Sequence, residues 1–266
     1  MIAADLTVSR AAGVLAAAPA ALITDIDGTI SRIVARPDAA VVSESARASL
    51  GALAQRLALV AVITAREERV ARRMIGVDEL VYVGNYALDG ASAAHIGERP
   101  LADAEAAVRP LLRDLPCVTL EEKGVAFSLH YRNCHEEGVR ERLIALVAPL
   151  AEAADARILE GKQVIELVPR ALPDKGMAVA RLLERNSIRG AVYLGDDRTD
   201  VSAFGAVHRW GREQRKPALC VAVVSSEAPE ALVSRADYLL AGPHEVCRFL
   251  NWAVCQMMRP GGGVAG

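Results

Sequence analysis

Aromatic residues are scarce in this sequence: three Phe, two Trp and five Tyr make up 4% of 266 residues. A hydrophobic core must therefore be built mainly from Ala, Val and Leu. Such a composition favours an α/β protein of buried strands and small-faced helices over an aromatic-rich β-sandwich. The length allows one large domain or two modest ones. With 52% hydrophobic and 24% charged residues, the composition is typical of a soluble globular protein.

A strong charge of either sign is also lacking, because the formal net charge is −2. Because the protein has no overall positive charge, nucleic acid and anionic membranes are not expected as its partners. No apolar run is long enough to span a membrane. The segment 16–20 resembles a signal-peptide cleavage region, but no basic stretch precedes it and the segment before it carries Asp5 and Arg10. We therefore expect a first helix here and no secretory leader.

Cysteine is infrequent, and the five residues are scattered, odd in number and free of CxxC spacing. This pattern favours reduced thiols in a cytoplasmic protein. A disulfide framework or a zinc site is not expected.

Apolar runs alternate with helical patterns in the first part of the chain. Strands are predicted at 21–24, 59–63 and 81–83, with helices at 43–57, where Ser43 or Ser45 is the N-cap, and at 66–74. This order is typical of βαβ units, so the sequence predicts a doubly wound, Rossmann-like parallel sheet.

The middle of the chain has a different pattern, in which a helix precedes each of two β-hairpins. From residue 174 the first pattern returns, with four further helices, one of them a short helix between residues 224 and 237, and three further strands. The predicted middle elements are helices 102–113 and 140–154 and strands 117–122, 125–131, 157–159 and 164–168; the later ones are helices 174–186, 200–207 and 243–258 and strands 191–194, 219–224 and 237–240.

These patterns predict two domains and a short tail. Residues 1–86 and 171–266 form an α/β core, residues 87–170 form an inserted α+β cap, and residues 261–266 form a disordered tail. An insert at this position is expected to cover the carboxyl ends of the core strands, where open α/β sheets bind their ligands.

Acidic residues follow two of the predicted core strands. Asp25 and Asp27 come directly after the first strand, and Gly28 allows the chain to turn away. A single motif of this kind is as often an Asx turn as a functional site. After the strand 191–194, however, the sequence GDDRTD at 195–200 places three more carboxylates.

The acidic residues of GDDRTD also have a purely structural interpretation, because Asp197 or Asp200 can cap the next helix. Three carboxylates close to another acidic strand end repel one another, and a hard divalent cation relieves that repulsion. Carboxylate ligands suit magnesium better than zinc. We therefore predict a Mg²⁺ site.

Two more residues complete a candidate phosphate site. Thr64 follows the strand 59–63 and offers a hydroxyl ahead of a helix N-terminus, and Lys175 supplies a cation at the start of a helix. A helix-capping Thr and a solvated Lys are the ordinary alternatives. Their order between the two acidic motifs favours a shared site.

Together these motifs resemble the four motifs of the haloacid dehalogenase superfamily of aspartate-nucleophile phosphatases. Within it, the chain most resembles the trehalose-6-phosphate phosphatases. The more specific similarities lie in the insert, in EEKG at 121–124, HYRN at 130–133 and GKQVIEL at 161–167, and at the end of the core in GDDRTD followed by Ala203-Phe204.

The resemblance implies a role for each core residue. Asp25 is the nucleophile and Asp27 the general acid and base, while Thr64 and Lys175 bind the phosphoryl group. The metal ligands are Asp25, the backbone carbonyl of Asp27, and Asp196; Asp197 and Asp200 orient a metal-bound water or Lys175.

The resemblance also implies that the insert binds sugar hydroxyls or phosphate. Cross-strand charge pairing on an exposed hairpin is the alternative for these side chains. The predicted substrate-binding residues are Gly28, Arg66, Glu121, Lys123, His130, Arg132 and Glu166.

The sequence departs from the family pattern at three places, and the last of these bears on the sugar. Ile26 replaces a usual Tyr, Thr64-Ala65-Arg66 replaces Ser-Gly-Arg, and Tyr86-Ala87 stands where a His-Gly pair is usual. The expected activity is hydrolysis of the small-molecule sugar phosphate trehalose 6-phosphate by a monomer or weak oligomer. Alternatives are a phosphatase of sucrose phosphate or of a mannosyl- or glucosyl-phosphoglycerate, a phosphomutase, and a catalytically silent binding domain.

Overall fold

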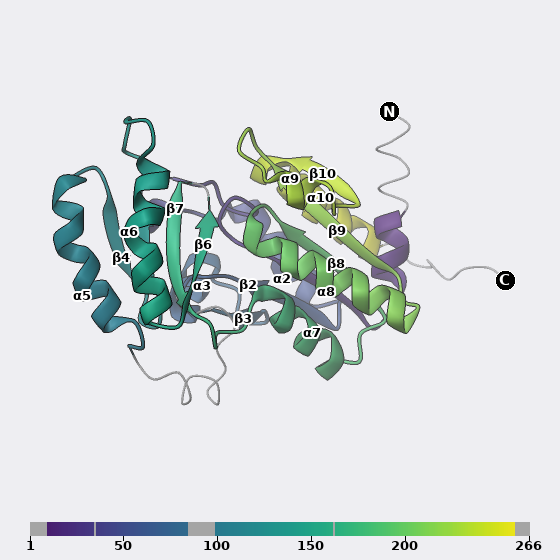
Figure 1. Cartoon of the computed structure of the whole chain (residues 1–266). Coiled ribbons are helices and arrows are strands. Elements are labelled where there is room, and N and C mark those ends of the chain that lie inside the picture. Colours follow the sequence, from purple (N-terminus) through teal and green to yellow (C-terminus); the bar gives the residue numbers. More distant parts are fainter. Residues whose placement is uncertain (1–9, 35, 85–98, 162, 259–266) are drawn as a thin grey trace. The chain divides into compact units, whose positions relative to one another are not determined.

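The computed structural model describes residues 10–34, 36–84, 99–161 and 163–258. The chain divides into two compact units (Figure 1): a core of Met1–Gly84 with Asp174–Gly266, and an insert of Asn85–Pro173. The sequence placed the insert at residues 87–170.

The core unit is built on a six-stranded sheet in the order β10-β9-β8-β1-β2-β3. Every neighbouring pair of strands is parallel, as predicted. The central strands are completely buried, as expected for a sheet covered on both faces. The strands are β1 (Ala20–Thr24), β2 (Leu59–Ile63), β3 (Val81–Val83), β8 (Gly190–Gly195), β9 (Ala218–Val224) and β10 (Tyr238–Ala241).

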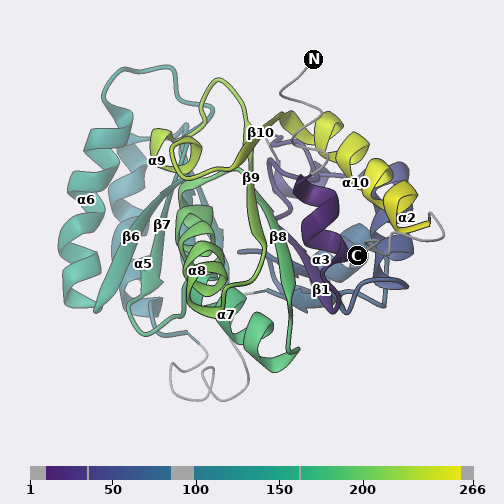
Figure 2. The same ribbon diagram turned by 90° about the vertical axis from the view of Figure 1, so that its right-hand side faces the viewer.

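Helices cover both faces of this sheet (Figure 2). The helical residues 10–16, α2 (Glu44–Ala54), α3 (Glu68–Ile75) and α10 (Gly242–Met258) share one hydrophobic cluster with the sheet. On the other face lie α7 (Lys175–Arg185) and α8 (Arg198–Gln214), with the short α9 (Glu230–Val233) after β9. A 3₁₀ turn, η1, spans Pro37–Ala39. The predicted doubly wound α/β fold is confirmed.

Local sequence signals explain where several helices begin. Ser43 is the N-cap of α2, because its hydroxyl accepts a hydrogen bond from the amide of Ala46, which decides between the two serines predicted. Asp174 caps α7 in the same way. The helix α8 is twice as long as the predicted 200–207, and it continues through Gly211. A Cβ at Gly211 would lie 2.7 Å from the Cβ of Ala218, so this glycine allows close packing against β9.

The insert is a four-stranded antiparallel sheet in the order β4-β5-β7-β6. Alternate residues of β5 and β7, Phe127, Leu129, Ile165 and Leu167, pack with the helices in one hydrophobic cluster, so the residues between them lie on the opposite face. The elements are α5 (Ala102–Leu111), η3 (Leu112–Asp114), β4 (Thr119–Glu122), β5 (Phe127–His130), α6 (Val139–Ala153), β6 (Ala156–Gly161) and β7 (Val164–Pro169).

The expectation that all cysteines are reduced is wrong for the insert, where Cys117 and Cys134 form a disulfide with Cα atoms 5.1 Å apart. The scatter along the sequence was misleading because β4 and β5 are antiparallel, with Thr119 opposite His130. Residues that flank an antiparallel pair meet in space even when they are 17 positions apart. Cys220, Cys247 and Cys255 are free thiols.

Some expectations fall outside the described residues. These are the disordered tail at 261–266 and the Tyr86-Ala87 departure. Among the residues that are described, none of the helices combines the length and apolar character needed to cross a membrane.

Candidate active site

The first acidic motif lies at the carboxyl end of β1, in the middle of the sheet. The amide of Asp25 donates a hydrogen bond to the carbonyl of Leu194, 3.0 Å away, so Asp25 continues the pairing of β1 with β8. Its side chain is buried. Gly28 then turns the chain with φ of 87°, and a Cβ there would lie 1.9 Å from Asp196 Oδ2. Glycine at 28 therefore permits both the turn and the close approach of the two acidic motifs.

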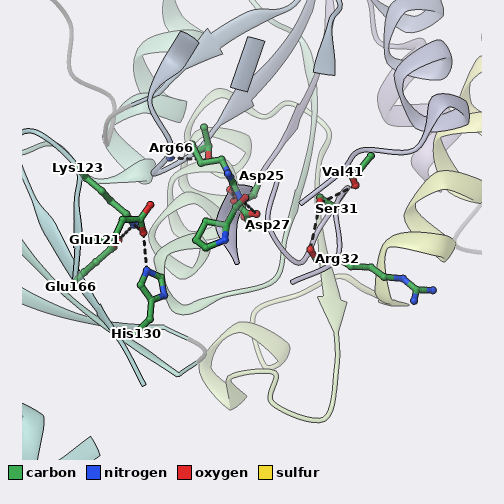
Figure 3. A network of polar contacts seen from close by, with 12 residues as sticks. Asp25, Asp27, Ser31, Arg32, Val41, Arg66, Glu121, Lys123, His130 and Glu166 are labelled. Carbon is green, nitrogen blue, oxygen red and sulfur yellow. Dashed lines mark hydrogen bonds and ion pairs between the residues drawn. The ribbon is translucent and has the colours of Figure 1, made fainter. Parts of the chain in front are cut away.

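Asp27 is held by Arg66 in a bidentate pair (Figure 3). Arg66 Nε lies 2.6 Å from Asp27 Oδ2, and Arg66 Nη2 lies 2.7 Å from Asp27 Oδ1. The same Nη2 also donates to the carbonyl of Pro37. Two parallel charge-assisted hydrogen bonds fix the carboxylate of Asp27 in one orientation.

Lys175 joins the two acidic strand ends. Its Nζ lies 3.0 Å from Asp25 Oδ1 and 2.7 Å from Asp200 Oδ1, and all three side chains are buried. Lys175 is the first residue of α7, whereas Asp200 lies in the first turn of α8. The fold therefore brings residues 25, 175 and 200 together from three separate elements.

The carboxylate of Asp200 is surrounded by donors. Its Oδ1 accepts from Lys175 and from the Tyr193 hydroxyl at 2.8 Å, and its Oδ2 accepts from the amides of Asp196 and Asp197 at 3.0 and 3.1 Å. The last of these bonds belongs to a capping box in which Asp197 is the N-cap of α8. The capping interpretation of both residues is thus correct, and Asp200 contacts Lys175 in addition.

Asp196 is completely buried beside the first motif. The hydroxyl of Thr29 donates to Asp196 Oδ1 at 3.2 Å, and Gly28 approaches Asp196 Oδ2 closely. One oxygen of Asp25, one of Asp196 and one of Asp200 all lie within 4.8 Å of one another. Lys175 offsets only one of these three charges.

Burial and the neighbouring charges shift the pKa values of both Asp25 and Lys175. Burial raises the pKa of Asp25 well above its ordinary value; Lys175 opposes this rise, and Asp200, Asp196 and Asp27 add to it. Burial alone would lower the pKa of Lys175, but Asp200 and Asp25 outweigh it and raise that pKa above the ordinary value. Lys175 therefore stays protonated between two carboxylates.

This cluster fits a hard divalent cation. Buried carboxylates in excess of their cationic partners are costly, and oxygen donors are the ligands that Mg²⁺ prefers. Asp25 and Asp196 are the suitable side-chain ligands. Asp200 is less suitable, because protein donors already occupy both of its oxygens.

A second cluster in the core, His208, Cys220 and Asp237, also has three ligand atoms within 4.8 Å of one another. Asp237 there accepts from the amide of Cys220 at 2.8 Å, contacts His208 Nε2 at 2.9 Å and pairs with Arg10. Burial raises the pKa of the Cys220 thiol, so it remains protonated. This cluster is a structural network that connects α8, β9 and the first helical segment.

Thr64 directly follows β2, the strand next to β1, and its amide donates to the carbonyl of Val83. Its hydroxyl oxygen accepts a hydrogen bond from the amide of Arg66 at 3.2 Å. A hydroxyl that accepts still has its own proton to donate. The helix α3 begins only at Glu68, so the expected helix N-terminus lies four residues beyond Thr64.

In the insert, a row of polar side chains crosses the sheet face opposite to the helices. Glu121 pairs in register with Ser128, and Ser128 pairs with Glu166. The Ser128 hydroxyl donates to Glu166 Oε1 at 2.7 Å, and Lys123 forms an ion pair with the same oxygen. His130 Nε2 lies 2.7 Å from Glu121 Oε2 (Figure 3).

These insert residues pair with one another, as the cross-strand interpretation predicted. The row is partly buried, since Glu166 and Lys123 side chains are 10% and 17% exposed. For Glu121, burial alone would raise the pKa, but the His130 hydrogen bond and Lys123 outweigh it and lower the pKa. The negative charge of each glutamate has a partner within the insert.

Arg132 lies on the loop after β5. The amide of Tyr131 donates to the carbonyl of Gln163, and Cys134 closes the disulfide on the other side. The loop that carries Arg132 is therefore fixed at both ends.

Two buried polar residues of the site were not predicted. Thr29 belongs to the first motif, but its hydrogen-bond partner, Asp196, is distant in the sequence, so the contact could not be predicted. Tyr193 lies in the apolar strand β8 and reads as core, although a buried Tyr hydroxyl usually needs a hydrogen-bond partner. That need is the signal from which its role could have been found.

Comparison with known proteins agrees with this geometry. A model of the trehalose-phosphatase family matches residues 23–238, which include every core residue of the site. The chain belongs to the trehalose-phosphatase family. The match spans most of the core and the whole insert.

Relatives and solved structures extend the family match. A trehalose-phosphate phosphatase of Mycolicibacterium paratuberculosis is 37% identical over 218 residues, which is 75% of this chain and 54% of that protein. An uncharacterized glycosyl hydrolase of Mycobacterium tuberculosis is 35% identical over 253 residues, which is 89% of this chain but 18% of that protein. The chain thus spans about a fifth of the length of one of these two relatives and about half of the other.

Among solved structures, the C-terminal domain of the trehalose-6-phosphate phosphatase of C. albicans aligns with a TM-score of 0.80 and 19% identity. The alignment covers 94% of this chain and 96% of that one, and it supports the fold.

Proposed function

We propose that this chain hydrolyses trehalose 6-phosphate to trehalose and inorganic phosphate through an aspartyl-phosphate on Asp25. The observation that carries the proposal is the buried contact of Lys175 with both Asp25 and Asp200, beside Asp196, in a member of the trehalose-phosphatase family. The arrangement supplies a nucleophile, a fixed cation and oxygen ligands for a metal.

In the first step, a carboxylate oxygen of Asp25 attacks phosphorus and the bond from phosphorus to the sugar oxygen breaks. Asp27 gives its proton to the departing sugar oxygen. In the second step, a water attacks the aspartyl-phosphate, Asp27 takes the proton of that water, and inorganic phosphate leaves. Lys175 and the Thr64 hydroxyl bind the phosphoryl oxygens, where negative charge spreads in the transition state.

Arg66 has a place in this cycle because it already contacts the acid and base. Its two hydrogen bonds keep Asp27 as an acceptor, which is the form that deprotonates water. To act as an acid, Asp27 must be released. We infer that Arg66 moves to the substrate phosphate when it binds, which agrees with the substrate-binding role expected from the sequence.

The residues that would hold Mg²⁺ are Asp25, Asp196 and the backbone carbonyl of Asp27. When bound, the ion neutralises the phosphate and the attacking carboxylate, so that two anions can approach each other. Asp197 and Asp200 orient their neighbours: Asp197 begins α8, and Asp200 anchors Lys175.

For the insert, we propose that Glu121, Lys123, His130, Arg132 and Glu166 recognise the sugar. Paired glutamate, lysine and histidine side chains offer both donors and acceptors to hydroxyl groups. The observation in favour is that Glu121, His130 and Glu166, from three strands, lie on the sheet face without helices, and Lys123 contacts Glu166 there.

A second candidate is a phosphatase of another sugar phosphate, such as sucrose phosphate or a mannosyl- or glucosyl-phosphoglycerate. The observation that favours it is the Tyr86-Ala87 sequence, where the family usually has a His-Gly pair. The core residues serve either substrate equally.

The test is phosphate release from a panel of sugar phosphates, with Mg²⁺ or EDTA, using purified protein. Metal-dependent turnover that is highest for trehalose 6-phosphate is the expected result. Higher turnover of a different sugar phosphate would support the second candidate, and no turnover of any ester would contradict the phosphatase proposal.

A further inference from the structure

Tyr193 is a buried phenol beside the site. It lies in β8 between Ile23 of β1 and Cys220 of β9, and its side chain is completely buried. The ring contacts Phe204 of α8 edge to face, with centroids 5.9 Å apart. Both the sheet and α8 therefore fix the position of its hydroxyl.

That hydroxyl is directed at the anchor of the catalytic lysine. Tyr193 Oη lies 2.8 Å from Asp200 Oδ1, the same oxygen that lies 2.7 Å from Lys175 Nζ. Because Asp200 is a carboxylate that accepts from a protonated lysine, the phenol must be the donor. Burial, followed by the neighbouring Asp200 and Asp25, raises the pKa of Tyr193, so the phenol keeps the proton that it donates.

The four donors fix Asp200 in three dimensions. The amides of Asp196 and Asp197 hold Oδ2, and they orient the carboxylate from its own helix terminus. Tyr193 is the partner that holds Oδ1 from the sheet. Without it, Oδ1 keeps Lys175, whose long side chain has several rotamers and must also reach Asp25.

We propose that Tyr193 is a positioning residue for phosphoryl transfer: its hydroxyl fixes Asp200 Oδ1, which in turn holds Lys175 at Asp25. The inference rests on the proposed function, because Lys175 is taken to bind the phosphoryl group. It extends the site beyond the four sequence motifs to a residue in the middle of β8.

The experiment uses Tyr193→Phe, which removes one oxygen and keeps the ring. The matched control is Tyr82→Phe: Tyr82 is also buried in a strand of the core, and its hydroxyl donates to the carbonyl of Val77 at 2.8 Å. Both variants lose one hydroxyl hydrogen bond of a buried tyrosine, but Tyr82 has no part in the proposed chemistry. Stability is followed by thermal unfolding in parallel with kinetics.

The expected result is a split between kcat and KM. Tyr193→Phe lowers kcat roughly tenfold or more, as expected for a lost hydrogen bond to a charged group, and changes KM for the sugar phosphate less than about twofold. Inhibition by orthovanadate, which mimics the transition state, weakens by a similar factor. Tyr82→Phe leaves kcat, KM and vanadate inhibition at the wild-type values.

A double-mutant cycle with Asp200→Asn isolates the proposed route. If Tyr193 acts through Asp200, adding Tyr193→Phe to Asp200→Asn lowers kcat by less than about twofold. Full, multiplicative effects of the two substitutions would overturn the proposal. So would a wild-type kcat in Tyr193→Phe, or equal losses of kcat in Tyr193→Phe and Tyr82→Phe.

The wild-type protein in the same assay separates the two proposals. Turnover by the wild type together with an unchanged Tyr193→Phe variant overturns the positioning role and leaves the proposed function standing. A wild type that releases no phosphate from any ester overturns the proposed function, and the positioning role with it.

Discussion

The core and the insert each contain a network of charged side chains, and the two networks are built differently. In the core, Asp25, Asp196 and Asp200 are buried around Lys175, so carboxylates outnumber the lysine. In the insert, Glu166 is paired with Lys123 and Glu121 contacts His130, and the side chains are partly exposed.

The difference shows what charge balance says about function. A buried excess of negative charge is stable only with a cation or with raised pKa values, so the core network itself indicates a ligand. A network whose charges are paired internally is stable without a ligand. The function of the insert network can therefore be inferred only from the family to which the chain belongs. Experiments on the two networks should give different kinds of effect.

The largest effect is expected from Asp25→Asn, which keeps the size of the side chain and removes the nucleophilic oxygen. Turnover falls by at least about 10⁴-fold, because loss of a nucleophile is not compensated by the rest of a site. Phosphate release measures the loss, and circular dichroism checks the fold. Appreciable turnover by this variant would sink the covalent mechanism.

A smaller effect is expected from Asp196→Asn, which weakens a proposed metal ligand. The Mg²⁺ concentration for half-maximal activity rises by at least about tenfold, the low end of what even indirect partners of a metal contribute. The control is Asp237→Asn, in the second core cluster, which leaves this concentration unchanged even if the melting temperature falls. An equal response of both variants would mean that the metal is not bound at Asp196.

In the insert, Arg132→Ala is expected to act on the sugar alone. KM for the preferred sugar phosphate rises about tenfold, as for one lost hydrogen bond from a charged group, while KM for p-nitrophenyl phosphate changes little. Arg113→Ala, in the exposed turn η3, is the matched control and leaves both values unchanged. Equal effects of Arg132→Ala on both esters would exclude a role in sugar recognition.

The smallest effect on catalysis is expected from removal of the disulfide. Replacing Cys117 and Cys134 by Ser lowers the free energy of unfolding by about 3 kcal/mol for a loop of this length, with turnover of p-nitrophenyl phosphate unchanged. Urea unfolding with and without reductant measures the difference. Cys255→Ser, at an exposed free thiol, is the control without effect. Identical unfolding of wild type and the double variant would contradict a stabilising role.

Sequence reasoning predicted the sheet well because its signals are local. Buried apolar runs and helix caps depend on neighbours in the chain, and the strands β1, β2 and β3 lie within a residue of the predicted ranges. The meeting of residues 25 and 196 was also predictable, because parallel strands place their carboxyl ends at one edge of a sheet.

What escaped prediction depends on contacts between distant residues. The disulfide requires the register of β4 and β5, and the role of Gly211 in α8 depends on its close approach to Ala218. The Tyr193 hydroxyl finds Asp200 only after β8 and α8 have packed. None of these pairings leaves a pattern in the local sequence.

The position of β1 between β2 and β8 has a consequence for synthesis of the chain. The ribosome delivers β1 and β2 early, but β8 comes only at Gly190–Gly195, after the whole insert. Until then one edge of β1, a strand that is fully buried in the folded core, has no neighbour from its own sheet, which is a known hazard for aggregation. The insert thus lengthens the interval in which this edge is unpaired, and Asp25 gains its backbone partner, the carbonyl of Leu194, only when β8 has been made.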